Sequence, residues 1–252
     1  MRIFAAVLLV SLGASRLVSG QITEVPSAGS VNLPMYRPIL VGQGPDALIN
    51  RIDTEELLKD GQKDGWVRFI CAVRKNGEVM WSQVFGSAPN SDLLKQELAK
   101  RLSAAEAQRF MPGVYNHKLV DGIFYGTLTF QVVNGKSRLR IFSNQQPAEV
   151  AAESDFIDPQ PFFGAESKFT GFHYPEDKTP VIVDGSVQVK LKIDANGSVL
   201  SGVVAAEEPP YLGFAEAAVV DLTSAKFIPA FRAGKPVECE VVLPVLYKAR
   251  NF

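Results

Sequence analysis

The chain has 252 residues and a formal net charge of −1, with 46% apolar and 21% charged residues. This is the composition of folded globular domains, and the length favours two small domains over one. A near-neutral chain without a basic stripe gives no electrostatic support to nucleic-acid binding.

The N-terminus predicts an export signal. Arg2 precedes an apolar run at residues 3–12, and small residues follow at 13–15 and 18–20, as before a signal-peptide cleavage site. The run has about half of the ~20 residues that a membrane-spanning helix needs. We therefore expect residues 1–20 to be removed and the protein to be periplasmic or secreted. An uncleaved inner-membrane anchor is the alternative.

One segment of the chain occurs twice, at a constant offset of 120 residues. Residues 64–84 read DGWVRFICAVRKNGEVMWSQV, and residues 184–204 read DGSVQVKLKIDANGSVLSGVV. Each copy predicts a β-hairpin that turns at an Asn-Gly pair, which accepts positive φ in two-residue turns. A repeat of this kind predicts a duplicated domain.

The first half begins with an extended arm at residues 21–45, in which 36–41 favour a short edge strand. Residues 46–59 favour a helix with Asp46 as its N-cap, and we interpret the acidic residues within it as a solvated face. Those residues are Asp53, Glu55 and Glu56. The expected elements that follow are strands at 66–73 and 79–85, a helix from Asp92 that a capping box at Ser103 and Glu106 interrupts, and strands at 123–133 and 138–142.

A connector at residues 143–173 is rich in proline, glycine and acids, yet it also carries several phenylalanines. A free linker would not contain so many aromatic residues, so we expect an ordered segment that packs across the domains. The elements expected after it are strands at 186–193 and 199–204, a helix at 211–224 and a last strand at 237–247. Pro244 cannot donate to a ladder, which predicts an edge or a bulge there.

These elements predict an α+β fold of two tandem small domains, at residues 46–142 and 174–252. Each domain is a three- to four-stranded antiparallel sheet in ββαβ order, packed against one or two helices.

No set of side chains predicts catalysis. Cys71 and Cys239 lie on the apolar side of their strands, which favours two buried thiols over a bridge between the domains. His117 and His173 have no ligand-spaced partners, so no metal and no cofactor is expected. The chain contains no nucleophile elbow, P-loop or dinucleotide fingerprint, and we expect that it is not an enzyme.

The second half resembles the TonB C-terminal domain family. The residues that carry the resemblance are Tyr174-Pro175, Gly185-Ser186-Val187, Asn196-Gly197-Ser198-Val199, Ala217-Ala218, Phe227-Ile228-Pro229-Ala230 and Gly234-Lys235-Pro236-Val237. The first half is similar to the family more weakly, with Phe110-Met111-Pro112-Gly113 at the helix exit, and we interpret it as a diverged copy.

The resemblance implies a non-enzymatic protein that binds a protein or peptide at the cell envelope, such as an outer-membrane protein. In the family, an extended segment of the partner pairs with the exposed edge of the last strand. The residues that this implies here are Val237, Glu238, Cys239, Glu240, Val241, Val242 and Leu243. An edge blocked by Glu238, Glu240 and Pro244, or by the other repeat, is the structural alternative. The functional alternative is a membrane-anchored energy transducer of the TonB type for outer-membrane transport, although the short apolar run and short arm argue against it.

Overall fold

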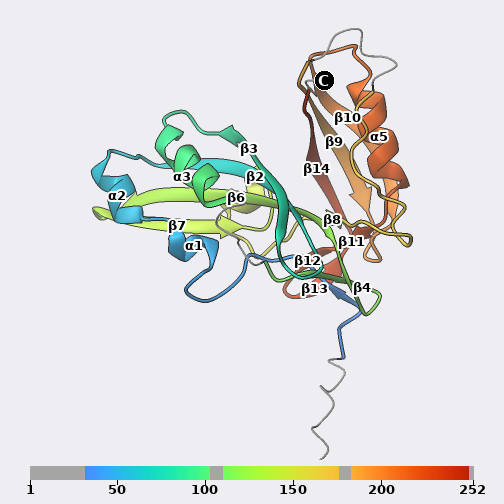
Figure 1. The fold of residues 1–252 in the computed structure, drawn as a ribbon, viewed down its shortest axis with the longest axis horizontal. Helices are drawn as coiled ribbons and strands as arrows, with labels where there is room; N and C mark the ends of the chain where they lie inside the picture. Colours follow the sequence, from blue (N-terminus) through green and yellow to red (C-terminus); the bar gives the residue numbers. More distant parts are fainter. Residues whose placement is uncertain (1–31, 103–109, 176–182, 250–252) are drawn as a thin grey trace, which may run out of the picture. The chain divides into compact units, whose positions relative to one another are not determined.

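Antiparallel sheets and a few helices make up the described part of this computed structural model, residues 32–102, 110–175 and 183–249. Strands account for 45% of the residues and helices for 18%, which confirms the predicted α+β class (Figure 1). The predicted signal peptide, residues 21–31 of the arm and the capping box at Ser103 and Glu106 lie outside the described residues. By contacts, residues 33–252 form one compact unit.

The first half folds around a four-stranded antiparallel sheet of order β3-β2-β6-β7. Its strands are β2 (Gly65–Val73), β3 (Val79–Ser87), β6 (Gly122–Val133) and β7 (Lys136–Phe142). Helix α3 (Asp92–Leu102) buries Leu94, Leu98 and Leu102, and these leucines join one hydrophobic cluster with the apolar side chains of β2 and β6. The predicted hairpin, helix and returning strands are therefore confirmed.

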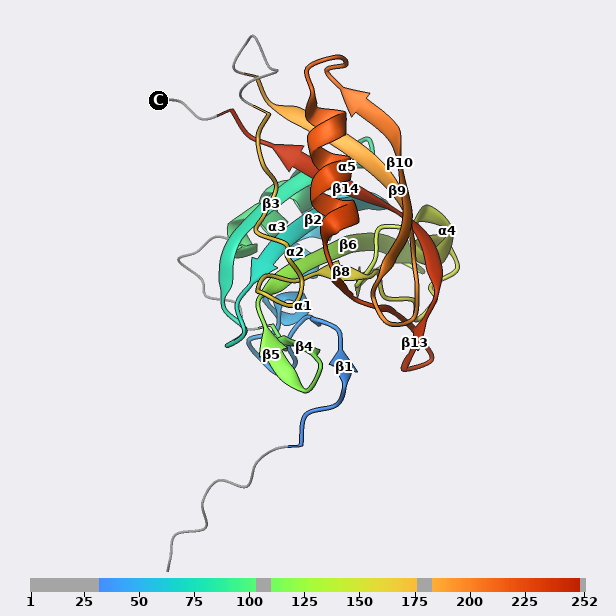
Figure 2. The same cartoon turned by 90° about the vertical axis from the view of Figure 1, so that its right-hand side faces the viewer.

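The second half folds around a three-stranded antiparallel sheet of order β10-β9-β14. The strands are β9 (Gly185–Ile193), β10 (Val199–Glu208) and β14 (Cys239–Tyr247). Helix α5 (Phe214–Ser224) lies along one face of β9 and β10 and buries Phe214, Ala218 and Leu222 (Figure 2). The helix begins three residues later than predicted, because Gly213 before it has a left-handed backbone.

The hairpin turns of both halves have a common geometry that differs from the predicted two-residue turn. Only Gly77 and Gly197 have positive φ, whereas the preceding asparagines do not. The N–H of each glycine bonds to the carbonyl three residues earlier, which is a type I turn closed by a glycine bulge. The side chain of Asp194 stabilises the second turn by accepting from the N–H groups of Asn196 and Ser198.

Each turn glycine also binds the segment that leaves the helix. The carbonyl of Gly77 accepts from the N–H of Phe110 at 2.8 Å, and that of Gly197 accepts from Phe227 at 2.9 Å. A Cβ on either glycine would overlap the carbonyl oxygen of the same phenylalanine. The Asn-Gly and Phe-Xaa-Pro motifs are therefore in contact, which explains why both halves carry both.

The helix predicted at residues 46–59 is in fact two helices, α1 (Leu48–Arg51) and α2 (Thr54–Lys59). Asp53 separates them and caps α2, since its side chain accepts from the N–H groups of Glu55 and Glu56 at 3.1 and 2.9 Å. The residue at the N-cap of α1 is Ala47, not Asp46. Asp53, which we predicted to lie on a solvated face, is thus the N-cap of α2.

The connector is ordered, as predicted, and it contains two elements that the sequence pattern did not indicate. They are α4 (Pro147–Ala151) and β8 (Gln160–Pro161), and β8 pairs with β11 (Phe227–Ile228). Phe156, Phe162 and Phe169 are all buried. Short strands that were also not expected are β4 (Gly113–Tyr115), β5 (Lys118–Val120), β12 (Ala230–Arg232) and β13 (Lys235–Val237), while β1 (Tyr36–Arg37) lies within the predicted edge strand.

Candidate functional site: the edge of the last strand

Strand β14 forms one edge of the second sheet. It pairs with β9 without a register shift, from Cys239 opposite Ile193 to Tyr247 opposite Gly185, and no other described strand pairs with it. Five of the seven predicted binding residues, 239–243, lie on this strand. The other two lie outside it, because Val237 belongs to β13 and pairs with Ala230, and Glu238 lies between β13 and β14.

The N–H and carbonyl groups of every second residue of β14 point away from β9. Both the N–H and the carbonyl of Val242 bond to the side chain of Gln146, which lies outside the sheet. Since these groups alternate along a strand, those of Glu240 and Leu246 face the same open side. The backbone of Pro244 also faces this open side, so the N–H that proline lacks would not have bonded to β9. This agrees with the edge position that Pro244 predicted.

Gln146 occupies this edge much as one peptide group of an added strand would. Its Oε1 accepts from the Val242 N–H at 3.2 Å, and its Nε2 donates to the Val242 carbonyl, also at 3.2 Å. Among the described residues, no hydrogen bond from another segment reaches the outward backbone groups of Glu240, Pro244 or Leu246. The edge is therefore covered at one residue and open on either side of it.

The buried carboxylate of Asp158 holds Gln146 in place. It is 1% exposed, and it accepts from Nε2 of Gln146 at 3.0 Å and from the N–H of Gln145 at 2.8 Å. Burial raises the pKa of Asp158 to about 7, with the two hydrogen bonds opposing that effect. Gln145 itself donates to the carbonyls of Phe69 and Gly126, so this segment is fixed to the first sheet.

A cavity of about 200 Å³ lies beside the covered position. Its lining includes Gln146, Val242 and Pro244 on one side and Arg68 on the other. The Arg68 guanidinium stacks over the ring of Trp66 at 4.8 Å, and burial lowers its pKa from the ordinary value. A cation therefore stands next to the edge at which a strand could pair.

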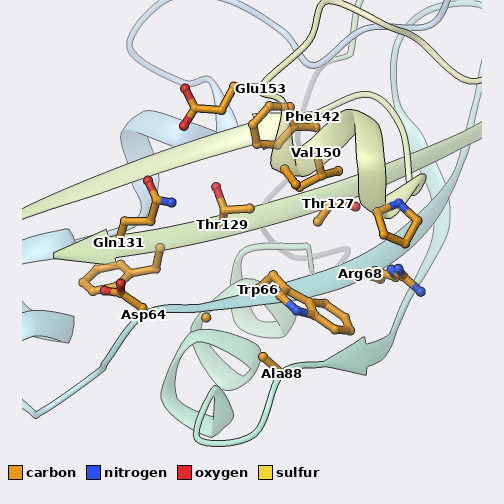
Figure 3. A pocket seen from close by; sticks show the side chains of 14 residues that line it. Asp64, Trp66, Arg68, Ala88, Thr127, Thr129, Gln131, Phe142, Val150 and Glu153 are labelled. Atoms are coloured by element: carbon orange, nitrogen blue, oxygen red, sulfur yellow. The ribbon is translucent and has the colours of Figure 1, made fainter. Parts of the chain in front are cut away.

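A larger cavity of about 550 Å³ lies on the outer face of the first sheet (Figure 3). Trp66, Thr129 and Gln131 project into it from β2 and β6, with Val150 of α4 across from them (Figure 3). Glu153 at its rim forms ion pairs with Arg138 and Arg140. The carboxylates that line the cavity thus have structural partners, and the lining combines a partly exposed indole with amide and hydroxyl groups. This cavity could not be predicted from the sequence, because its lining comes from five separate segments.

Ion pairs cover the outward face near the start of β14. Lys190 pairs with Glu240 at 2.9 Å and Lys192 pairs with Glu238 at 3.0 Å. The hydrogen bond from Lys190 lowers the pKa of Glu240. These pairs are exposed, and they neutralise the two acids that could have repelled a partner from the strand.

The cysteines and histidines have structural surroundings. Cys71 and Cys239 are free thiols, the first buried and the second half-buried, and burial raises the pKa of Cys239 to about 12. His173 was not predicted to have an acidic partner, yet its Nδ1 lies 2.7 Å from Asp221, and its Nε2 lies 3.1 Å from the hydroxyl of Thr170. The side chain of His173 is 64% exposed, and none of these three residues lines the two cavities. The cluster ties the end of the connector to α5.

Residues 32–102, 110–175 and 183–249 contain no group of three or more His, Cys, Asp or Glu side chains that could hold a metal ion. None of the helices described there combines the length and the hydrophobicity needed to cross a bilayer.

A comparison with protein families gives one match. Residues 170–249 match the family described as Gram-negative bacterial TonB protein C-terminal. No curated protein and no solved structure matches the chain significantly. The matched segment contains β9, β10, α5 and β14, which together make up the second sheet and its helix. A domain of this family implies a protein-interaction role in the cell envelope, where such domains interact with outer-membrane proteins. Residues 170–249 therefore match the TonB C-terminal domain family that the sequence motifs of the second half resemble.

Proposed function

We propose that this chain is a non-enzymatic periplasmic protein that captures an extended segment of an envelope protein by strand addition at β14. The observation that carries the proposal is a difference between the two sheets. In the first sheet β6 pairs with β2 on one side and with β7 on the other. In the second sheet β14 pairs with β9, and no strand in the described part of the chain takes the place that β7 has in the first sheet.

Strand β7 therefore serves as an internal example of the proposed complex. An incoming segment would pair antiparallel with β14 or run parallel to it, and it would bond to the backbone of Glu240, Val242 and Leu246. Such main-chain bonds provide affinity with little sequence preference. Selectivity then depends on the side chains around the edge.

Gln146 must leave Val242 before a continuous strand can bind. Its two bonds are each worth about 1 kcal/mol, so the incoming segment replaces an interaction that the free protein already has. This arrangement satisfies the edge backbone in the unbound state and protects it from unspecific pairing. Removal of the side chain is expected to strengthen binding by up to about thirtyfold.

Arg68 gives the edge a charge preference. Its guanidinium lines the cavity beside Val242 and forms no ion pair among the described residues. A segment with an Asp or Glu next to the residue that pairs with Val242 would meet this cation in a partly desolvated setting. We therefore expect acidic residues in the bound segment.

The first half, in this proposal, is a diverged copy of the same domain, with residues 46–142 and 174–252 as the two domains. The shared strand order and the shared bond between turn glycine and phenylalanine support it. Because β7 pairs with β6, only the second domain would present its returning strand, β14, at an edge of the sheet.

Capture from an envelope extract tests the proposal. Val242→Pro removes only the outward N–H, since Val242 does not bond to β9, and Val242→Thr is the matched control that keeps it. We expect Val242→Pro to lose the partner, Val242→Thr to retain it and Gln146→Ala to capture more of it. Equal capture by all four proteins would contradict strand addition at β14.

The energy-transducing role is the second candidate, because the same family match supports it. It requires the N-terminal apolar run to stay in the membrane. N-terminal sequencing of the protein from fractionated cells separates the two roles. A start near Ser15 or Gln21 in the soluble periplasmic fraction supports the binding protein, and an intact Met1 in the membrane fraction supports the transducer.

A further inference from the structure

The opposite edge of the second sheet, strand β10, lacks the protection that β14 has. Leu200, Val203 and Val204 are 53%, 58% and 42% exposed, and β10 pairs only with β9 among the described strands. Seven of its ten residues are exposed, against one of nine in β3, the strand at the corresponding position of the first sheet. No charged residue interrupts Val199 to Ala206. A long edge with exposed apolar side chains and no such guard is a surface for strand pairing.

The adjoining side of α5 continues this apolar surface. Gly202 of β10 approaches the methyl group of Thr223, so the helix stripe that contains Thr223 borders the edge. Val220 lies on the same stripe at helical spacing and is 64% exposed. The apolar surface therefore extends from the strand onto the helix above it.

We propose that β10 pairs with β10 of a second copy of this chain, antiparallel across a two-fold axis at Val203. This occupant covers both exposed edges at once and joins two three-stranded sheets into one of six strands. Val203 faces its own copy, and Val204 lies opposite Gly202 of the partner. Both α5 helices then lie on the same face of the joined sheet, so that each Val220 is directed toward the other.

Charge complementarity supports a second copy as the occupant. With the axis at Val203, Glu208 of one copy lies opposite Ser198 of the other copy. Ser198 forms a β-bridge with Lys226 of its own chain. The Lys226 Nζ lies there and donates to the Ser198 hydroxyl at 3.1 Å. Within the described part of the chain, neither Glu208 nor Lys226 forms an ion pair. The two-fold axis thus brings an unpaired acid to an unpaired base, twice per dimer. A parallel arrangement would instead place the two Glu208 side chains together.

The regular part of β10 fits this register. Register shifts occur between Val199 and Ser201 and between Val204 and Ala206, so the undistorted segment is 201–204. The proposed axis lies within that segment. Since β10 and β14 are opposite edges of the sheet, this proposal and strand addition at β14 can fail independently.

Cysteine cross-linking of the whole purified chain tests the proposed axis. In a Cys239→Ser background, Val203→Cys should form a disulfide-linked dimer under mild oxidation, because directly opposed residues have Cβ atoms about 5 Å apart. Val133→Cys is the matched control, an exposed valine of another sheet. Linked dimer from Val203→Cys alone supports the proposal, whereas none, or equal amounts from both variants, overturns it.

Sedimentation velocity provides the second test and needs no new cysteine. Wild type and Val133→Lys should sediment as dimers and Val203→Lys as a monomer. Glu208→Lys and Lys226→Glu should each weaken the dimer, and the double variant should restore it. A wild type that stays monomeric at the highest soluble concentration overturns the proposal. If Val203→Lys fails to fold by circular dichroism, the charge-exchange set decides, and absence of restoration counts against the pairing.

Discussion

Asp158 connects the edge strand to the pH of the compartment. An exposed aspartate has a pKa of about 4, whereas burial raises that of Asp158 to about 7 in the folded protein. The folded protein therefore retains a proton that the unfolded chain has lost between these values. With respect to this group, stability is greatest below about pH 4 and falls as the pH rises to about 7.

We predict that Asp158→Asn removes this pH dependence. A pKa that is three units higher in the folded protein lowers the free energy of unfolding of the wild type by on the order of 4 kcal/mol between pH 4 and pH 7. Urea unfolding of both proteins across this range measures the difference, in which the contributions of all other acids cancel. Asp60→Asn, at an exposed position, should leave the slope unchanged. Parallel stability curves for wild type and Asp158→Asn would contradict the account.

At the scale of the elements, the Asn-Gly turns differ in what their glycines do. In the hairpin of β9 and β10, Gly197 has positive φ, and a Cβ there would overlap the Phe227 carbonyl. In the hairpin of β6 and β7, Gly135 also has positive φ, but a Cβ would contact nothing within 4 Å. Gly135 thus serves only its own turn, whereas Gly197 also packs its turn against Phe227, in the segment that follows α5.

Alanine substitutions separate these two roles. Gly135→Ala should cost about 1 kcal/mol of unfolding free energy, from the left-handed backbone alone. Gly197→Ala should cost more than about 3 kcal/mol, since the turn must move away from Phe227 as well. Chemical denaturation measures both, and equal losses would show that the contact between turn and helix exit is unimportant.

The elements that could be predicted from the sequence are those with a regular pattern. Strands β9 and β14 alternate between buried and less buried residues, α3 and α5 carry apolar stripes, and Pro244 indicates an edge. The break at Ile52-Asp53 was missed, because the partial apolar stripe there continues across it and Asp53 was taken for a surface acid. The division of the last strand at Glu238 was missed because β13 has the same alternation as β14.

Only one part of the candidate site, the strand β14, could be predicted from the sequence. The strand that offers its backbone was identified from the resemblance, but Gln146 and Asp158 were not, since they lie in an irregular connector 84–96 residues before Val242. Polar side chains that bond to a distant backbone leave no periodic signal. The pairing of His173 with Asp221 was missed for the same reason.

For the molecule as a whole, the two sheets differ in how their edges are covered. In the first sheet β7 pairs with the outer side of β6, whereas in the second sheet Gln146 bonds to β14 at Val242, and no second described strand pairs with β14 or β10. In the account proposed here, β14 takes the partner segment and β10 takes a second copy. A dimer would then present two peptide-binding edges, which would raise the avidity for a partner with two segments.

Amide hydrogen exchange along β14, measured by NMR on this protein, tests the central claim most directly. The exchange is measured without and with a synthetic peptide that has the sequence of the captured partner's segment. Before peptide is added, the amides of Val241, Leu243 and Val245, which face β9, should be protected, and those of Glu240 and Leu246 should exchange fast. On saturation with the peptide, the account predicts strong protection of Glu240 and Leu246 and displacement of Gln146 from Val242. Outward amides that are already slow in the free protein, or that stay fast in the complex, would contradict strand addition at β14.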